Sequence, residues 1–119
     1  MNPFVTPDRI LVHSRPQDMR AGIVRLAETV ACELGRDPAD GTLFVFISRD
    51  RRKLKMLRFE CSAWCMWHVR LARGALRWTW DEPGGAGTPL ERRQLLWLLE
   101  GLSVDQPQAC AEVRATRVV

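Results

Sequence analysis

The sequence lacks the features that identify several large classes of protein. It contains no tyrosine and only two histidines among its 119 residues. Its longest uninterrupted apolar runs, such as 43–47 and 95–99, have five residues each, whereas a membrane-spanning helix needs about 20. The first residues have no positively charged segment followed by an apolar one, so they do not predict a secretory signal peptide. We therefore expect a cytoplasmic protein that makes no membrane contact.

Catalytic motifs are also missing. The sequence has no nucleophile elbow and no glycine-rich phosphate loop. Two-metal phosphoryl transfer needs clustered carboxylates. Asp8, Asp18, Asp37 and Asp40 instead fall at expected turns and helix caps, where they have structural roles. The sequence therefore predicts a protein that is not an enzyme and has no catalytic residues.

Cysteine is scarce and does not form a metal-binding pattern. Cys61, Cys65 and His68 have C-x₃-C-x₂-H spacing, but no fourth ligand lies nearby and tetrahedral zinc needs four. We therefore expect no metal site and no cofactor. In a reducing compartment the four cysteines are expected to be buried thiols rather than disulfides.

Positive charge is concentrated in one segment of the chain. Nine arginine and lysine residues lie between Arg49 and Arg77, against two carboxylates, Asp50 and Glu60. This segment has a net charge of +7, whereas residues 1–48 sum to −1 and residues 78–119 to −2. Such a patch attracts a phosphate backbone, although charged loops also keep an edge strand soluble. We expect a nucleic-acid-binding surface on β-hairpins.

Four of the five tryptophans lie in or just after this basic segment, where they could stack on unpaired bases. A tryptophan in a strand is more often part of the core. Trp67 shares its strand parity with apolar neighbours, so we expect it inside. Trp64 has the opposite parity and is expected to be exposed, and Trp78 and Trp80 share one face.

Hydrophobic periodicity predicts a single α+β domain over residues 1–119. We expect a curved antiparallel sheet of about five strands, with an amphipathic N-terminal helix packed on it and a C-terminal helix. The first helix would start at Ser14 or Asp18 and be ended by Gly35. The last would be capped by Thr88 and ended by Gly101. The expected strands are 9–13, 42–48, 54–61, 64–71 and 76–80, with the last two forming a hairpin.

The expected C-terminal helix carries more apolar surface than one core face needs. Leu95, Leu98, Leu99 and Leu102 would form its inward stripe. Leu90 and Trp97, seven residues apart, would then project from the opposite side. Either the helix is deeply buried, or these two residues form a partner-binding patch. We expect the patch, which would pair two copies as a homodimer or else dock another protein.

Five segments of this chain resemble motifs of a known family in the same order. They are Asp-Met-Arg-Ala-Gly at 18–22, Asp-Gly-Thr-Leu-Phe-Val-Phe at 40–46, Leu-Lys-Met-Leu at 54–57, Arg-Leu-Ala-Arg-Gly at 70–74 followed by Trp78, and Leu-Leu-Glu-Gly-Leu at 98–102. Together they resemble the TnpB or Orf-two-like accessory protein of the sixty-six family of bacterial insertion sequences. The resemblance covers about 10–104 and leaves the tail, 105–119, unexplained. It implies an accessory factor for transposition that works beside a separate transposase.

We therefore expect a noncatalytic transposition accessory protein that binds DNA with low sequence specificity. The alternative is a protein–protein adaptor that docks a transposase or another partner without touching DNA. The expected nucleic-acid-binding residues are Arg49, Arg51, Arg52, Lys53, Lys55, Arg58, Arg70, Arg73, Arg77 and Trp64.

Overall fold

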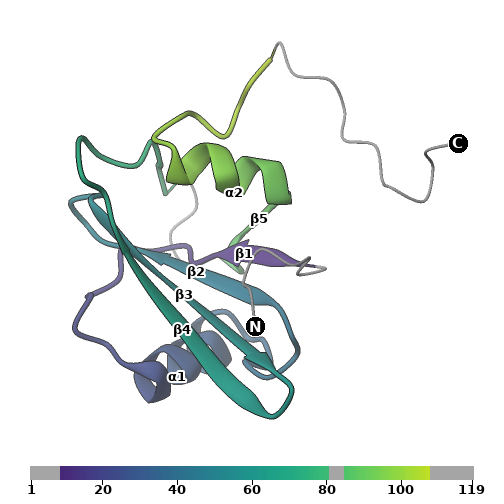
Figure 1. The fold of residues 1–119 in the computed structure, drawn as a ribbon. Helices are drawn as coiled ribbons and strands as arrows, with labels where there is room; N and C mark the ends of the chain where they lie inside the picture. The colour runs from purple at the N-terminus through teal and green to yellow at the C-terminus, as the bar shows by residue number, and fades with distance from the viewer. Residues whose placement is uncertain (1–8, 81–84, 108–119) are drawn as a thin grey trace, which may run out of the picture.

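The computed structural model describes residues 9–80 and 85–107, and within them a five-stranded sheet lies between two helices (Figure 1). The elements, in chain order, are β1 (Ile10–Val12), α1 (Ile23–Glu33), β2 (Leu43–Ile47), β3 (Lys53–Glu60), β4 (Ala63–Arg70), β5 (Thr88–Leu90) and α2 (Arg92–Leu99). The predicted α+β class is confirmed. Asp8, Cys110 and most of the C-terminal tail lie outside the described residues.

The strand order is β4-β3-β2-β1-β5. β1 and β2 are parallel, with Ile10 opposite Leu43, and every other pair is antiparallel. The sheet is therefore mixed, not antiparallel throughout as predicted. The difference arises because the chain crosses over through α1 between β1 and β2, and a crossover of this length joins parallel strands.

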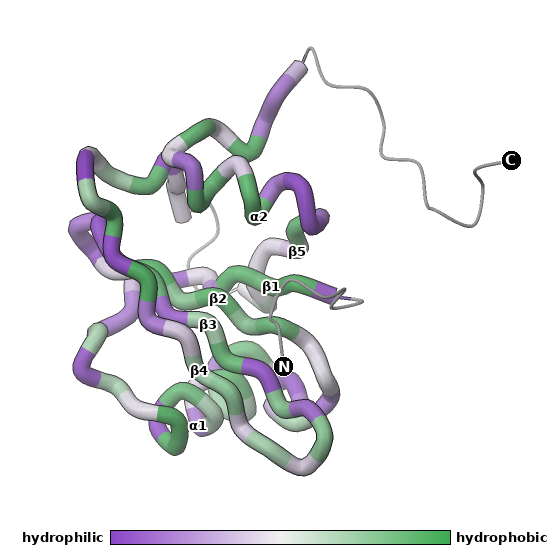
Figure 2. Tube along the Cα trace, viewed as in Figure 1, coloured by the Kyte–Doolittle hydropathy of each residue, from purple (hydrophilic) through white to green (hydrophobic). Residues whose placement is uncertain are grey.

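One face of the sheet packs on α1. Alternate residues of the central strands, Leu11, Phe44 and Phe46 among them, bury their side chains against Leu26 and Val30 of the helix. This confirms the expected packing of the first helix on the sheet. In Figure 2 the central strands are largely hydrophobic, which fits strands that are covered on both sides.

The opposite face packs on α2. Strand residues that include Val12, Val45 and Met56 form a second core with Leu95 and Leu98 of the helix. Leu102, predicted to belong to this inward stripe, is instead 43% exposed. Within the described residues, each helix therefore covers one face of the sheet. Neither helix is long and apolar enough to cross a membrane.

The start of α1 differs from the prediction. The helix begins at Ile23 with Gly22 as its N-cap, not at Ser14 or Asp18. The Asp18 carboxylate instead accepts hydrogen bonds from the backbone N–H and guanidinium of Arg20, which close a local turn. The end of α1 matches the prediction, because Gly35 adopts a left-handed φ of 64°.

The start of α2 also differs. Thr88, Pro89 and Leu90 form β5, which pairs with β1 at the sheet edge, where proline is tolerated. The helix starts at Arg92 with a capping box between Glu91 and the Gln94 side chain, so the Thr88 cap was wrong. The residues 88–90 are compatible both with a helix start and with a short edge strand. They form the strand because β1 offers an unpaired edge for hydrogen bonding.

The predicted strand at 76–80 does not exist. β4 pairs with β3, not with this segment. Leu76 and Trp78 alternate inward and bury their side chains in the core on the α2 side. The alternation that predicted a strand therefore reflects an extended segment lying across the face of the sheet.

Candidate nucleic-acid interface

The turn between β2 and β3 holds the first part of the basic surface. The Ser48 N–H donates to the Lys53 carbonyl at 3.0 Å, and the Ser48 hydroxyl donates to the Asp50 carboxylate at 2.6 Å. That hydroxyl lowers the pKa of Asp50 below its usual value, so the carboxylate stays ionised and in place. The turn leaves the side chains of Arg49 and Arg52 exposed at its tip.

Residues 70–77 bring the second part to the same place. Lys53 lies opposite Arg70 in the β3–β4 ladder, which sets the end of β4 beside the turn. The Leu71 N–H then donates to the Arg52 carbonyl at 2.9 Å, and the Leu76 N–H donates to the Arg51 carbonyl at 2.6 Å. The segment is thereby wrapped around the turn.

We call this part of the sheet the basic end, at the upper left in Figures 1 and 2. Its arginines are exposed and its lysine is partly exposed. Its members are Arg49, Arg52, Lys53, Arg70, Arg73 and Arg77. The opposite end of the sheet holds the β3–β4 turn, with Glu60, and the start of α2.

Arg51 has a different role from its neighbours. Its Nε donates to the Trp78 carbonyl at 2.5 Å, and its guanidinium lies 4.8 Å from the centroid of the Trp80 ring. Its backbone adopts a φ of 60°, which few non-glycine residues do. Arg51 thus holds the 76–80 segment in place, whereas Arg49 and Arg52 leave their side chains exposed.

Lys55 and Arg58 are not on the surface. They are 6% and 8% exposed, because β3 is covered on both faces. The Lys55 ammonium donates to the Ala21 carbonyl at 2.7 Å, close to the start of α1. Arg58 pairs with Glu60 at 3.4 Å. Both were predicted to bind nucleic acid, but the structure buries them away from the exposed residues of the basic end.

The tryptophans divide as their parity predicted. Trp64 is 38% exposed and Trp67 packs against the core on the α2 side. Trp64, however, lies at the far end of β4 from Arg70, about 20 Å along the strand, and its ring meets Phe59 edge-on at 4.8 Å. It is therefore not part of the basic end. Trp78 and Trp80 lie beside Arg51 instead.

The predicted partner patch on the last helix is not formed. Leu90 belongs to β5, is 9% exposed and packs in the core on the α2 side. Trp97 lies on α2 and is partly exposed, with the Arg93 guanidinium 5.3 Å from its ring centroid. The two side chains do not share a helix, because the helix starts two residues after Leu90.

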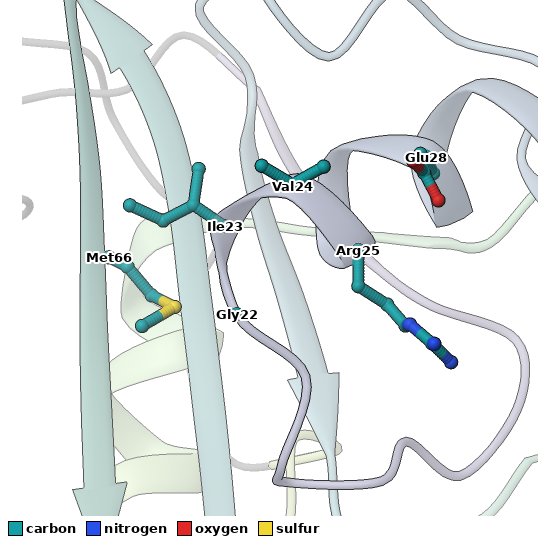
Figure 3. A pocket seen from close by; sticks show the side chains of 6 residues that line it. All are labelled: Gly22, Ile23, Val24, Arg25, Glu28 and Met66. Carbon is teal, nitrogen blue, oxygen red and sulfur yellow. The ribbon is translucent and has the colours of Figure 1, made fainter.

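An apolar surface that sequence reasoning missed lies beside β4. Figure 3 shows Ile23 and Met66 side by side at the start of α1, with Arg25 and Glu28 directed away from the sheet. Val24 also lines this hollow and is 73% exposed. Val24 directly follows the stripe residue Ile23, so helical periodicity places it off the buried face of α1.

Nucleophilic and metal-ligating side chains are dispersed in the described part of the chain. In residues 9–80 and 85–107 no three His, Cys, Asp or Glu side chains come together in a way that could hold a metal ion. Cys32 and Cys61 are exposed and Cys65 is partly exposed, so the expectation of buried thiols was wrong for the first two.

Fold and surface together define a small α+β protein with one basic end. Its sequence matches the family model described as IS66 Orf2 like protein over residues 8–109, and the chain belongs to that family. It is therefore a transposition-associated accessory protein, as the five motifs predicted. It is 34% identical over 100 residues to a Sinorhizobium fredii protein described as "Uncharacterized protein y4hO", which covers 84% of this chain and 85% of the relative. No solved structure matches it.

Proposed function

We propose that this protein binds nucleic acid through its basic end, as a noncatalytic accessory factor that works beside a separate transposase. The observation that carries the proposal is the convergence of two segments. Backbone hydrogen bonds from Leu71 and Leu76 to the 51–52 carbonyls hold residues 70–77 against the β2–β3 turn. Charges that are up to 28 positions apart in the sequence thus form one surface.

The electrostatics of this surface favour a polyanion. Five exposed arginines and a partly exposed lysine lie together, and Asp50 is the one carboxylate within residues 49–53. Asp50 accepts hydrogen bonds from the Ser48 hydroxyl and the Arg52 backbone N–H, so it is engaged in holding the turn. Binding to phosphates releases counterions from the nucleic acid, which supplies affinity without reading base sequence.

Low sequence specificity follows from the position of the helices. α1 and α2 both bury one side against the sheet, and neither forms part of the basic end. A side chain on a helix inserted in the major groove is the usual means of reading bases. The basic end instead consists of turn and strand-end residues, which suit backbone contacts.

Salt-dependent binding to a duplex of random sequence tests this proposal. With about five phosphate contacts, log K should fall against log salt with a slope of roughly −4 to −5. Arg52→Ala combined with Arg73→Ala should make the slope shallower by roughly 2, to the same extent on unrelated duplexes. Arg92→Ala is the matched control, because Arg92 is also exposed but lies at the opposite end of the sheet. Absence of binding at low salt would refute the proposal.

The adaptor alternative has an observation of its own. The apolar hollow of Ile23, Val24 and Met66 adjoins β4, whose outer side pairs with no strand among the described residues. An open strand edge beside exposed apolar side chains is a common site for a protein partner. Val24→Glu would abolish capture of the transposase if this is the docking surface, and would leave duplex binding unchanged.

A further inference from the structure

A small polar cleft lies next to the basic end. It has a volume of about 290 Å³ and is lined by residues that follow β1, by the extended 76–80 segment and by the start of β5. The lining residues that matter here are His13, Ser14, Trp78, Trp80 and Thr88. This volume is at the lower limit of small-molecule sites, so it suits a ligand with about one ring system.

Two indole groups of this cleft lack hydrogen-bond partners. The Nε1 atoms of Trp78 and Trp80 are buried, and neither has a hydrogen-bond partner in residues 9–80 and 85–107. Trp78 as a whole is 7% exposed. An indole N–H can only donate, and native proteins rarely leave a buried donor unpaired. Both tryptophans line the cleft, so it borders two residues whose N–H donors lack an acceptor among the described residues.

His13 adds an acceptor to the same cleft. It is 2% exposed, its Nε2 lies 3.5 Å from the Glu33 carboxylate, and its Nδ1 has no partner in the part of the chain that the structure describes. Burial lowers the pKa of His13, so the ring is neutral at pH 7. A proton on Nε2 is the tautomer that suits the carboxylate, and it leaves Nδ1 with a lone pair.

The cleft is joined to the basic end through Arg51. This side chain bonds the Trp78 carbonyl and covers the Trp80 ring, while its backbone lies in the basic turn. A strand whose phosphates contact Arg49 or Arg52 would therefore pass close to the two indoles.

We propose that this cleft receives one unpaired nucleobase of a bound strand. The inference rests on the proposed function and specifies it. A backbone phosphodiester fits less well, because it presents only acceptors and would meet the Nδ1 lone pair of His13. A base edge carries both acceptors and donors, and its flat face can stack on an indole.

Two single strands of equal phosphate count provide the test. A thymidine ten-mer should bind the full chain at least about fivefold tighter than an abasic ten-mer. Trp80→Phe, which removes the N–H, should abolish that preference without changing blunt-duplex binding. Trp64→Phe, at the far end of β4, should retain it. Equal affinity for the two strands, with blunt duplex still bound, would overturn the cleft and leave the proposed function standing.

If the protein binds neither strand, the proposed function is refuted. A second experiment then tests the cleft separately. The Nε1–H resonances of Trp78 and Trp80 should shift in an NMR titration with free thymidine and not with inorganic phosphate. Shifts caused by phosphate alone would show that the cleft binds an anion and not a nucleobase, and would overturn the inference. No shift with either ligand would also overturn it.

Discussion

Arg51 and Arg52 are adjacent arginines in one turn, yet the structure separates their roles. Arg51 is partly buried and donates to the Trp78 carbonyl, whereas the Arg52 side chain is exposed and forms no hydrogen bond within the described residues. We predict that Arg51→Ala lowers the stability of the fold and that Arg52→Ala lowers only the affinity for nucleic acid.

The magnitude for Arg51 follows from its contacts. A hydrogen bond from a charged donor contributes about 1.5–3 kcal/mol, and a cation–π contact at a partly exposed site contributes about 0.5–1 kcal/mol. Because Arg51 is not fully buried, we expect Arg51→Ala to cost about 2 kcal/mol, which corresponds to a melting temperature lower by roughly 6–12 °C. Arg52→Ala should stay within about 0.5 kcal/mol of wild type.

A third variant isolates the backbone contribution. Arg51 has a φ of 60°, where glycine is unstrained and alanine is not. Arg51→Gly should therefore be more stable than Arg51→Ala by about 1 kcal/mol, although both lose the same side-chain contacts. Urea unfolding followed by tryptophan fluorescence measures all three variants. Wild-type stability in Arg51→Ala, or a glycine variant no better than alanine, would refute the reasoning.

Three further predictions concern other parts of the fold. Lys55→Met should destabilise the protein by about 1–3 kcal/mol in urea unfolding, because it leaves the Ala21 carbonyl without its buried donor. Gly87→Ala should lower the melting temperature sharply, because Gly87 has a φ of 93° and the new Cβ would lie 2.8 Å from a β1 carbonyl oxygen. Gly22→Ala is the control and should be tolerated, since a Cβ at Gly22 would meet no atom within 4 Å. Burial lowers the pKa of His13 below 6.5, so below that pH the unfolded chain binds more protons at this residue than the folded chain does. The unfolding free energy should therefore be fully retained above pH 6.5 and should fall as the pH drops toward the pKa of the folded state. His13→Gln should flatten that dependence when unfolding is compared at pH 7.5 and 5.5.

The sequence contained enough to predict the class of fold and the central strands. The strands 43–47, 53–60 and 63–70 and the first helix all have strong periodicity, and their observed bounds lie close to the predicted ones except at the helix start. These segments are long, and the spacing of their apolar residues reflects whether one face or both faces are buried. That spacing can be read from the local sequence.

The failures lie where tertiary contacts override local signals. Thr88 and Pro89 form a good helix start in isolation, but in the fold they pair with the edge of β1 as a strand. Leu90, predicted to lie in an exposed patch, is therefore buried in the core. Likewise, no local pattern shows that Leu76 and Trp78 lie across the sheet, since alternation looks the same in a strand and in an extended covering segment.

The candidate surface could be predicted in part. Charge counting located the basic turn and the 70–77 segment, but it treated Lys55 and Arg58 in the same way as Arg52. Strand alternation cannot separate them when both faces of β3 are covered. The cleft at Trp78 and Trp80 was beyond prediction, because its lining residues come from three separate parts of the chain.

The most direct test of the central claim is an NMR map of backbone and arginine side-chain shifts as a short duplex is added to the full protein. We predict changes concentrated at Arg49, Arg52, Arg70, Arg73 and Arg77, with residues around Asp40, Glu60 and Arg92 at the opposite end unmoved. Shifts centred instead on Val24 and Met66, or absent at low salt, would contradict the assignment of the basic end as the nucleic-acid surface.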